Sequence, residues 1–262
     1  MDRKSYLPRI VDRQLQEYLK TFGAVCVEGP KWCGKPWTSS FHSKSELFIG
    51  DPAGNFQNRQ LAQLSPALVL EGETPRLIDE WQEAPPIWDA VRHQVDQRTG
   101  KGQFILTGSA TPNHKGILHS GAGRIARLRM RPMSLYESGD STGAVSLEAL
   151  CRGELRPAMT GEVDLKKLIG LIIRGGWPVG LSLSAQQAAL LPGEYLNAVI
   201  DDDVYRMDGG KRNTAKMRLL LRSLARNESA TATSRTLKHE RRGLDDEDLD
   251  GETAGGSLEM FA

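Results

Sequence analysis

A glycine-rich stretch, GPKWCGK from Gly29 to Lys35, has the composition and spacing of a phosphate-binding loop. Two glycines separated by four residues let the backbone curl, so that successive N–H groups converge on phosphate oxygens. The lysine at the end would neutralise the β- and γ-phosphates. The stretch follows a short apolar run, residues 24–29, that we predict to be a buried strand, and it precedes a predicted helix. The predicted phosphate-binding residues are Gly29, Pro30, Lys31, Trp32, Cys33, Gly34, Lys35 and Pro36.

Pro36 departs from the usual form of this motif, which has serine or threonine after the lysine. Proline offers no hydroxyl to coordinate Mg²⁺ and no N–H to donate to phosphate. It also biases Lys35 away from the α conformation, although a helix tolerates proline in its first turn. Losing one hydrogen bond to a charged group costs about 1–3 kcal/mol. Thr38 lies about 200° further around a helix, so it is not expected to replace the hydroxyl. We predict weak nucleotide binding and badly impaired Mg²⁺-dependent hydrolysis.

Two adjacent acids, Asp79 and Glu80, end a predicted strand at residues 75–80. In this arrangement Asp79 would hold Mg²⁺, and Glu80 would orient or deprotonate an attacking water. A strand followed by a capping aspartate would also explain the pattern taken alone. The position of the pair downstream of the phosphate-binding stretch favours the functional interpretation.

Two further residues could act on a γ-phosphate. The predicted strand 103–109 ends in small polar residues, of which Thr107 is preferred over Ser109, although T-G-S is also an ordinary turn composition. Arg124 follows two glycines and precedes the predicted strand 124–132, so it could reach a phosphate, including one on a neighbouring subunit as an arginine finger. The alternative is that the arginines of this predicted strand, Arg124, Arg127, Arg129 and Arg131, form a basic sheet edge or a nucleic-acid-binding patch. Every second residue of a strand shares a face, so Ile125, Leu128 and Met130 are not expected to lie on one face.

Strands alternate with helical patterns from residue 20 to about 140, which favours a parallel sheet covered by helices on both faces. Besides the four strands above, a fifth is predicted at 47–51. Helices are predicted at 8–22, from the loop to about Ser45, at 55–65 and at 85–100. We predict an α/β domain over residues 1–140, followed across a junction at Gly139–Gly143 by a smaller helical domain over 141–226. The helical patterns of that second domain cover 164–176, 184–206 and 214–227.

The last stretch, residues 227–262, is poor in apolar residues and rich in charged residues, Gly, Ser and Thr, which is a disorder composition. Its acidic group at 245–250 lacks the ligand alternation, central glycine and final glutamate of a calcium loop, so we interpret it as a solvated tail. A shift in reading frame near Asn227 would produce the same abrupt change.

Composition limits the classes of partner. The formal charge of +1 gives no electrostatic reason to expect nucleic acid, although the stretches 124–131 and 211–226 are locally basic and leave that alternative open. No apolar run reaches the length of a membrane span, and the N-terminus lacks the apolar core of a signal peptide, which predicts a cytoplasmic protein without a membrane partner. Three cysteines without metal-site spacing are expected to be reduced thiols.

Taken in order, these parts resemble the prokaryotic AAA-type ATP-binding proteins that carry a C-terminal domain of unknown function. The resemblance rests on YLPRIVD, GPKWCGK, LEGETPRLIDEWQEAP, FILTGSA, GRIARLRMRPMSLYES and RGGWP, and it covers roughly residues 6–226. It implies a P-loop NTPase core, ATP and Mg²⁺ as cofactors, ATP hydrolysis, a winged-helix-like segment within 141–226, and a homo-oligomer or a protein partner. Members of the family continue into a nuclease-like segment, so this chain is expected to be truncated. Pro36 keeps a second interpretation open, a non-catalytic scaffold derived from such an ATPase.

Overall fold

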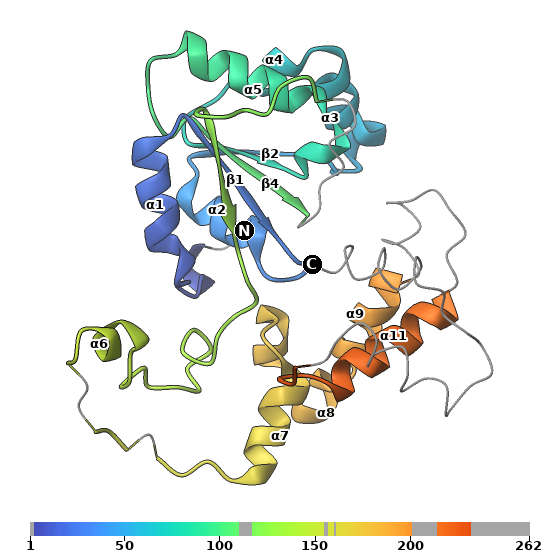
Figure 1. Cartoon of the computed structure of the whole chain (residues 1–262). Coiled ribbons are helices and arrows are strands. Elements are labelled where there is room, and N and C mark those ends of the chain that lie inside the picture. The colour runs from blue at the N-terminus through green and yellow to red at the C-terminus, as the bar shows by residue number, and fades with distance from the viewer. Residues whose placement is uncertain (1–2, 110–116, 155–156, 160, 201–213, 232–262) are drawn as a thin grey trace. The chain divides into compact units, whose positions relative to one another are not determined.

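The computed structural model describes residues 3–109, 117–154, 157–159, 161–200 and 214–231 (Figure 1). The chain forms two compact units, residues 1–189 and 190–262. The first unit contains the sheet and all residues of the predicted site.

A five-stranded parallel sheet forms the centre of the first unit, with the strand order β2-β3-β4-β1-β5 (Figure 1). The strands are β1 (Ala24–Gly29), β2 (Ser45–Phe48), β3 (Arg76–Asp79), β4 (Phe104–Ser109) and β5 (Ile125–Arg129). The α/β fold and the parallel sheet predicted from the sequence are confirmed. The strand predicted at 47–51 lies two to three residues too late, and the one predicted at 124–132 ends earlier, at Arg129.

Helices cover both faces of this sheet (Figure 1). They are η1 (Arg3–Ser5), α1 (Val11–Thr21), α2 (Lys35–His42), α3 (Ala53–Leu64), α4 (Pro66–Val69), η2 (Trp81–Glu83) and α5 (Pro86–Gln97). Successive residues of β1 point to opposite faces, so the strand contributes to both cores. Cys26 joins the apolar cluster of α3, α4 and α5, whereas Val25 and Val27 join the cluster that contains Leu15 of α1.

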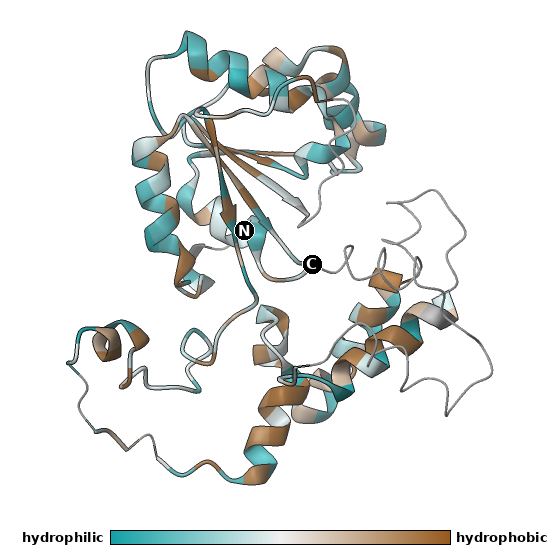
Figure 2. Ribbon diagram, viewed as in Figure 1, coloured by the Kyte–Doolittle hydropathy of each residue, from teal (hydrophilic) through white to brown (hydrophobic). Residues whose placement is uncertain are grey.

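Burial on both faces explains the consecutive apolar residues of β1, β3 and β4 (Figure 2). Leu77, Ile105 and Leu106 have no exposed surface, and each such side chain contributes about 1.5–3 kcal/mol of burial free energy. In β5 the pattern divides as predicted. Ile125 packs in one cluster, and Leu128, with Met130 just beyond the strand, packs in the other.

Short helices follow β5 within the first unit. They are α6 (Leu147–Cys151), α7 (Leu165–Arg174), η3 (Pro178–Ser182) and α8 (Ala185–Ala188). Local signals define α7: the Asp164 carboxylate accepts a hydrogen bond from the Lys167 N–H at 2.6 Å, and Gly175 ends the helix with a positive φ of 65°. A capping box of Ser184 and Gln187 begins α8.

The second unit contains α9 (Leu191–Ala198) and α11 (Thr214–Arg226), and an Arg218 guanidinium N–H donates to the Asn197 amide oxygen at 3.0 Å. The helical pattern predicted at 184–206 is found in its described part. It is divided into α8 and α9, with Pro192 in the first turn of α9, where proline is tolerated. Residues 201–206, part of the basic stretch 211–226 and most of the predicted tail lie outside the described residues.

Candidate functional site

The carboxyl ends of β1, β3 and β4 meet at one edge of the sheet. Gly29 is in register with Ser109, and Ile78 is in register with Leu106. Because β1 lies between β4 and β5, the strand order reverses beside it. Ligands of open parallel sheets bind in the crevice at such a point. The stretch from Gly29 to Lys35, which the sequence predicts to bind phosphate, begins where β1 ends.

The loop between β1 and α2 curls through two left-handed residues, Trp32 with a φ of 64° and Gly34 with a φ of 97°. Gly29 is held against the chain after β5, because a Cβ added to it would lie 2.3 Å from the Met130 carbonyl oxygen. The Cys33 side chain is fully buried in the core, where burial raises the pKa of its thiol. Cys33 therefore anchors the loop through packing, while the loop backbone is curled as the motif requires.

The Lys35 ammonium lies inside this loop. It donates hydrogen bonds to the carbonyl oxygens of Gly29 at 2.9 Å and Pro30 at 3.0 Å, and only 5% of the residue is exposed. Its positive charge also acts to lower the pKa values of Asp79 and Glu80. The lysine and the two acids, far apart in sequence, therefore share one electrostatic site.

Pro36 is the second residue of α2 and does not prevent the helix. The first hydrogen bond of this turn runs from the Thr38 N–H to the Gly34 carbonyl at 3.1 Å, so no intrahelical bond needs an N–H at position 36. Lys35 is helical in spite of the bias that proline imposes. The Thr38 hydroxyl lies 3.1 Å from the Tyr6 hydroxyl and is engaged there.

Asp79 ends β3, and Thr107 lies beside it on β4. The fully buried Thr107 hydroxyl donates to an Asp79 carboxylate oxygen and accepts from the Glu80 N–H at 3.2 Å. Burial raises the pKa of Asp79, against the opposing effects of Thr107 and Lys35. The structure thus brings Thr107 to the acids and uses its hydroxyl to orient them. Of Ser109 only the backbone position, opposite Gly29, is described.

Glu80 has a left-handed backbone, with φ 56° and ψ 48°, which is a strained conformation for a residue other than glycine. Its side chain accepts a hydrogen bond from the Gln82 amide. Burial raises the pKa of Glu80, and the neighbouring Asp79 raises it further. A raised pKa is a property that carboxyl groups acting as general bases share.

Arg124 lies at the other end of the sheet, which corrects its predicted role on the γ-phosphate of its own chain. The Arg124 carbonyl accepts a hydrogen bond from the N–H of Ala24, the first residue of β1. The loop instead begins at Gly29, the last residue of β1. The length of β1 separates the two, about 17 Å at 3.3 Å per residue. The Arg124 guanidinium instead pairs with Asp96 at 2.8 Å. An action on a neighbouring subunit stays a prediction.

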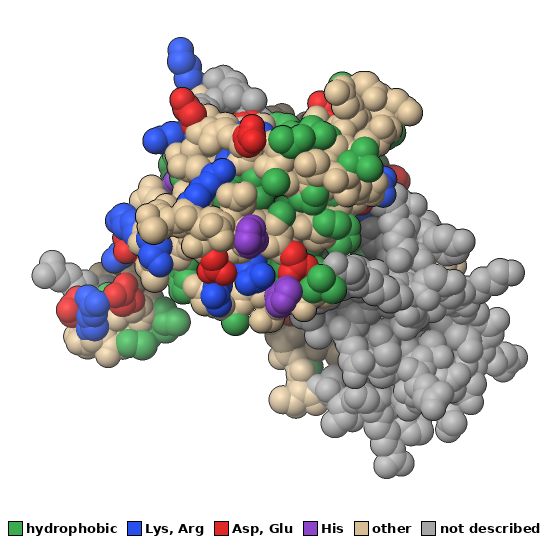
Figure 3. All heavy atoms as spheres, turned by 90° about the horizontal axis from the view of Figure 1, so that it is seen from above, with side chains coloured by type: hydrophobic (Ala, Val, Ile, Leu, Met, Phe, Trp, Pro, Cys, Tyr) green, Lys and Arg blue, Asp and Glu red, His purple; other side chains and the backbone are tan. Residues whose placement is uncertain are grey.

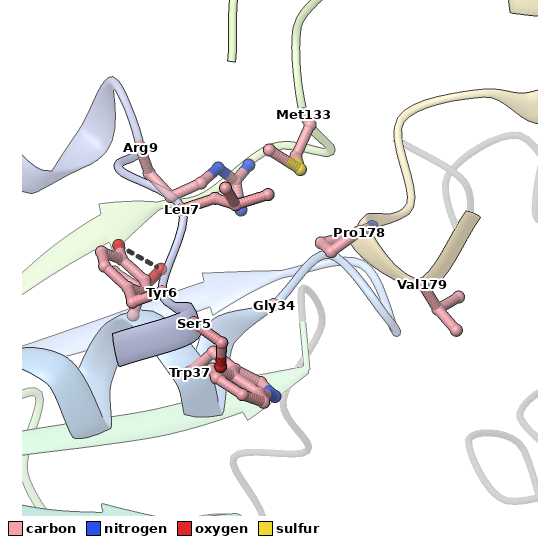
Figure 4. Close-up of a pocket in the computed structure, with 10 residues that line it drawn as sticks. Ser5, Tyr6, Leu7, Arg9, Gly34, Trp37, Met133, Pro178 and Val179 are labelled. Carbon is pink, nitrogen blue, oxygen red and sulfur yellow. Dashed lines mark hydrogen bonds between the residues drawn. The ribbon is translucent and has the colours of Figure 1, made fainter. Parts of the chain in front are cut away.

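A cavity of about 340 Å³ adjoins the loop (Figure 4). Tyr6 and Arg9, before α1, form one wall, Gly34 and Trp37 form another, and Pro178 of η3 forms a third. Sequence reasoning assigned no role to these residues outside the loop. The motifs YLPRIVD and RGGWP contained the signal, but their meeting depends on contacts between distant segments.

The oxygen donors suit a cation held mainly by a phosphate ligand. Asp79 and Thr107 supply carboxylate and hydroxyl oxygens, which Mg²⁺ prefers, and Pro36 supplies none. Among the described residues, no group of three or more His, Cys, Asp or Glu side chains could hold a metal ion without such a ligand. All three cysteines are free thiols.

On the face seen in Figure 3, the Lys and Arg side chains of the described residues are interspersed with Asp and Glu. In the part of the chain that the structure describes, no helix has the length and apolar character needed to cross a membrane.

Comparison with known proteins agrees with this geometry. The sequence profile of an AAA domain matches residues 21–139, which include all five strands, the loop, Asp79 and Glu80. This part of the chain therefore resembles an AAA domain. The Walker-type ATPase PABY2304 of Pyrococcus abyssi shares the fold with a TM-score of 0.53 and 15% identity, over 98% of this chain and 89% of that chain.

Two mycobacterial proteins are also similar to it. The uncharacterized proteins Rv2008c of Mycobacterium tuberculosis and Mb2031c of Mycobacterium bovis are each 29% identical over 150 residues, or 56% of this chain. The match spans 33% of the length of each relative.

Proposed function

We propose that the AAA-type domain binds ATP, with its phosphates in the loop from Gly29 to Pro36. The buried Lys35 ammonium carries this proposal. It is held by two loop carbonyls at the end of β1 and is coupled electrically to Asp79 and Glu80. A phosphate oxygen is a stronger acceptor for an ammonium group than a peptide carbonyl, because the hydrogen bond is then ionic on both sides. Phosphate binding would replace the hydrogen bonds from the Lys35 ammonium to the Gly29 and Pro30 carbonyls with stronger, ionic hydrogen bonds.

The cavity beside Gly34 suits the nucleoside end of the ligand. Its volume is near the lower limit of small-molecule pockets, and it combines an indole, a phenol and a proline ring with few polar groups. Gly34 lines the cavity and belongs to the loop, so a ligand could occupy both.

Three residues at the ends of β3 and β4 would bind the metal ion and activate water. Asp79 would hold Mg²⁺, whose chemistry is to neutralise charge on the phosphates. Thr107 orients Asp79, and Glu80 would orient or deprotonate water. Because Pro36 contributes neither hydroxyl nor N–H, we propose that Mg²⁺-dependent hydrolysis is weak while nucleotide binding persists.

Calorimetry tests the binding proposal, with ATP titrated into the protein with and without Mg²⁺. Lys35→Ala should lower ATP affinity at least tenfold through the loss of ionic hydrogen bonds. Lys101→Ala is the charge control, because it removes the same charge from an exposed position outside the loop and should change affinity much less. Equal affinity in the wild type and Lys35→Ala would contradict the proposal.

Pro36→Thr tests the account of hydrolysis. Restoring a hydroxyl and an N–H should strengthen Mg²⁺-dependent ATP binding by about ten- to hundredfold, and it should increase phosphate release. Equal phosphate release by the two proteins would refute a role for Pro36.

A second function, favoured by Pro36 itself, is a non-catalytic nucleotide-binding scaffold. Glu80→Gln separates the two. The substitution should abolish any residual phosphate release in an ATPase while ATP affinity is kept, and it should change nothing measurable in a scaffold.

A further inference from the structure

Arg9 precedes α1 but is built into the phosphate loop. One terminal guanidinium N–H donates to the Cys33 carbonyl oxygen at 2.7 Å, and the other donates to the Arg131 carbonyl at 2.9 Å. The Nε–H donates to a Glu137 carboxylate oxygen at 3.0 Å. Only 7% of the residue is exposed. The planar guanidinium thus joins three segments: the loop, the chain after β5, and the turn that contains Glu137.

The contact with Cys33 fixes the orientation of one particular peptide group. The Cys33 carbonyl and the Gly34 N–H belong to the same planar trans peptide, so they point in opposite directions. When Arg9 holds the carbonyl on its own side, the Gly34 N–H is directed away from Arg9. Gly34 is the N-cap of α2, where N–H groups have no partner inside the helix and are available to an anion.

The charge of Arg9 is already compensated. Glu137 pairs with it, with both side chains about 95% buried. The same carboxylate accepts hydrogen bonds from the N–H groups of Ile10 and Ser134 at 2.7 Å each. Burial alone would raise the pKa of Glu137, but the hydrogen bonds from Ser134 and Ile10 outweigh it and lower the pKa. Arg9 therefore acts on the loop mainly by orienting the Cys33 carbonyl, because Glu137 neutralises its positive charge.

We propose that Arg9 is a positioning residue of the phosphate site, which presents the Gly34 N–H to the bound phosphate by holding the Cys33 carbonyl. The proposal rests on the proposed phosphate-binding function of the loop. Lysine cannot substitute, because an ammonium on a flexible stem does not provide the planar, three-way donor set of a guanidinium.

The experiment compares Arg9→Lys with Arg13→Lys, which makes the same chemical change at an exposed position of α1. Affinity for inorganic tripolyphosphate without metal is measured by calorimetry, and the exchange rate and chemical shift of the Gly34 amide are measured by NMR in the ligand-free proteins.

Arg9→Lys should lower tripolyphosphate affinity about tenfold, the loss of one well-oriented hydrogen bond to a charged group. It should also change the Gly34 amide signal. Arg13→Lys should leave the affinity within twofold of the wild type and the Gly34 signal unchanged. A folded Arg9→Lys variant with wild-type affinity and an unchanged Gly34 signal would overturn the proposal.

The failure of the phosphate-binding function would be recognised separately. If neither the wild type nor Lys35→Ala binds tripolyphosphate, the proposed function is wrong. In that case the Gly34 signal still decides whether Arg9 orients the peptide, because it is measured without ligand. An unchanged signal in Arg9→Lys overturns the positioning role.

Discussion

Strand β4 and helix α7 are both rich in aliphatic residues, but they bury them very differently. Leu106 of β4 has no exposed surface, whereas Leu165 and Ile172 of α7 are 72% and 71% exposed. Figure 2 shows brown, hydrophobic segments in both elements. The helix is specified locally, by Asp164 at its start and Gly175 at its end. The burial of β4 depends on layers supplied by distant parts of the chain. Apolar composition alone therefore does not indicate how much an element contributes to stability.

Truncating one leucine in each element gives the largest expected difference. Leu106→Ala should lower the free energy of unfolding by about 2–5 kcal/mol, because it removes buried methyl groups and leaves a cavity. Leu165→Ala makes the same chemical change on an exposed face and should stay within about 0.5 kcal/mol. Denaturant unfolding of both variants measures the contrast. Comparable losses would mean that α7 is buried in the native protein.

Two glycines near the end of α7 differ in how closely they are packed. Gly176 follows the helix and contacts the chain after β5, whereas Gly170 lies inside the helix with open space beside it. At Gly176 an added Cβ would lie 2.4 Å from the Met133 carbonyl oxygen, and the Met133 N–H donates to the Gly176 carbonyl at 2.7 Å. We expect Gly176→Ala to cost about 1–3 kcal/mol through overpacking. Gly170, inside α7, has no atom within 4 Å of an added Cβ, so Gly170→Ala should stabilise the helix by about 0.5–1 kcal/mol.

Thermal unfolding and far-ultraviolet circular dichroism measure these two variants together. The two substitutions are expected to change the stability in opposite directions: Gly176→Ala lowers it and Gly170→Ala raises it. A loss of stability in both would show that α7 packs tightly along its length, and a gain in both would show that the backbone at Gly176 is free to move away from Met133.

The same contrast explains what the sequence could predict. Elements defined by local pattern were found correctly: the apolar run before Gly29, the loop with its lysine, and the strand that ends at Asp79. Their relative placement also follows from parallel topology, because the carboxyl ends of the strands meet at one edge. The same rule should have excluded Arg124, which immediately precedes β5 and therefore lies at the opposite edge from the loop.

Residues whose role depends on long-range contacts were not predicted. Arg9 reaches Cys33, Arg131 and Glu137 across most of the first unit, and no short pattern in the sequence encodes that meeting. Thr107 was found, but its hydroxyl is directed by the register of β3 against β4, which places it on Asp79. Spacing along the chain identifies candidate groups, and the strand register decides what each group touches.

Removing the cap of α7 should have a moderate effect that stays local. Asp164→Ala loses the hydrogen bond to the Lys167 N–H and should destabilise the helix by about 1 kcal/mol. Because α7 buries little, hydrogen exchange of its amides should increase while the unfolding of the sheet core changes hardly at all. Asp164→Asn, which keeps a capping oxygen, is the control. A matching loss of core stability would show that α7 and the sheet unfold as one unit.

The smallest effect is expected at the ion pair that ties the end of α7 to the chain after β5. Arg174 donates to the Asp140 carboxylate at 2.7 Å and to the Ser138 hydroxyl at 3.2 Å. Both charged side chains keep nearly a fifth of their surface exposed, so the pair should contribute less than about 1 kcal/mol. A double-mutant cycle with Asp140→Asn and Arg174→Gln measures that coupling free energy.

The pH dependence of this coupling has a definite sign. Burial would raise the pKa of Asp140, but hydrogen bonds from Ser138 and Arg174 lower it overall. A carboxyl group whose pKa is depressed by folding adds stability at pH values above the ordinary range of aspartate. That stability is lost as the pH falls through the depressed value. The coupling should therefore be present at neutral pH and vanish in acid. A coupling that persisted after protonation would come from neutral hydrogen bonds, and the end of α7 would then be attached to the sheet domain by packing and not by charge.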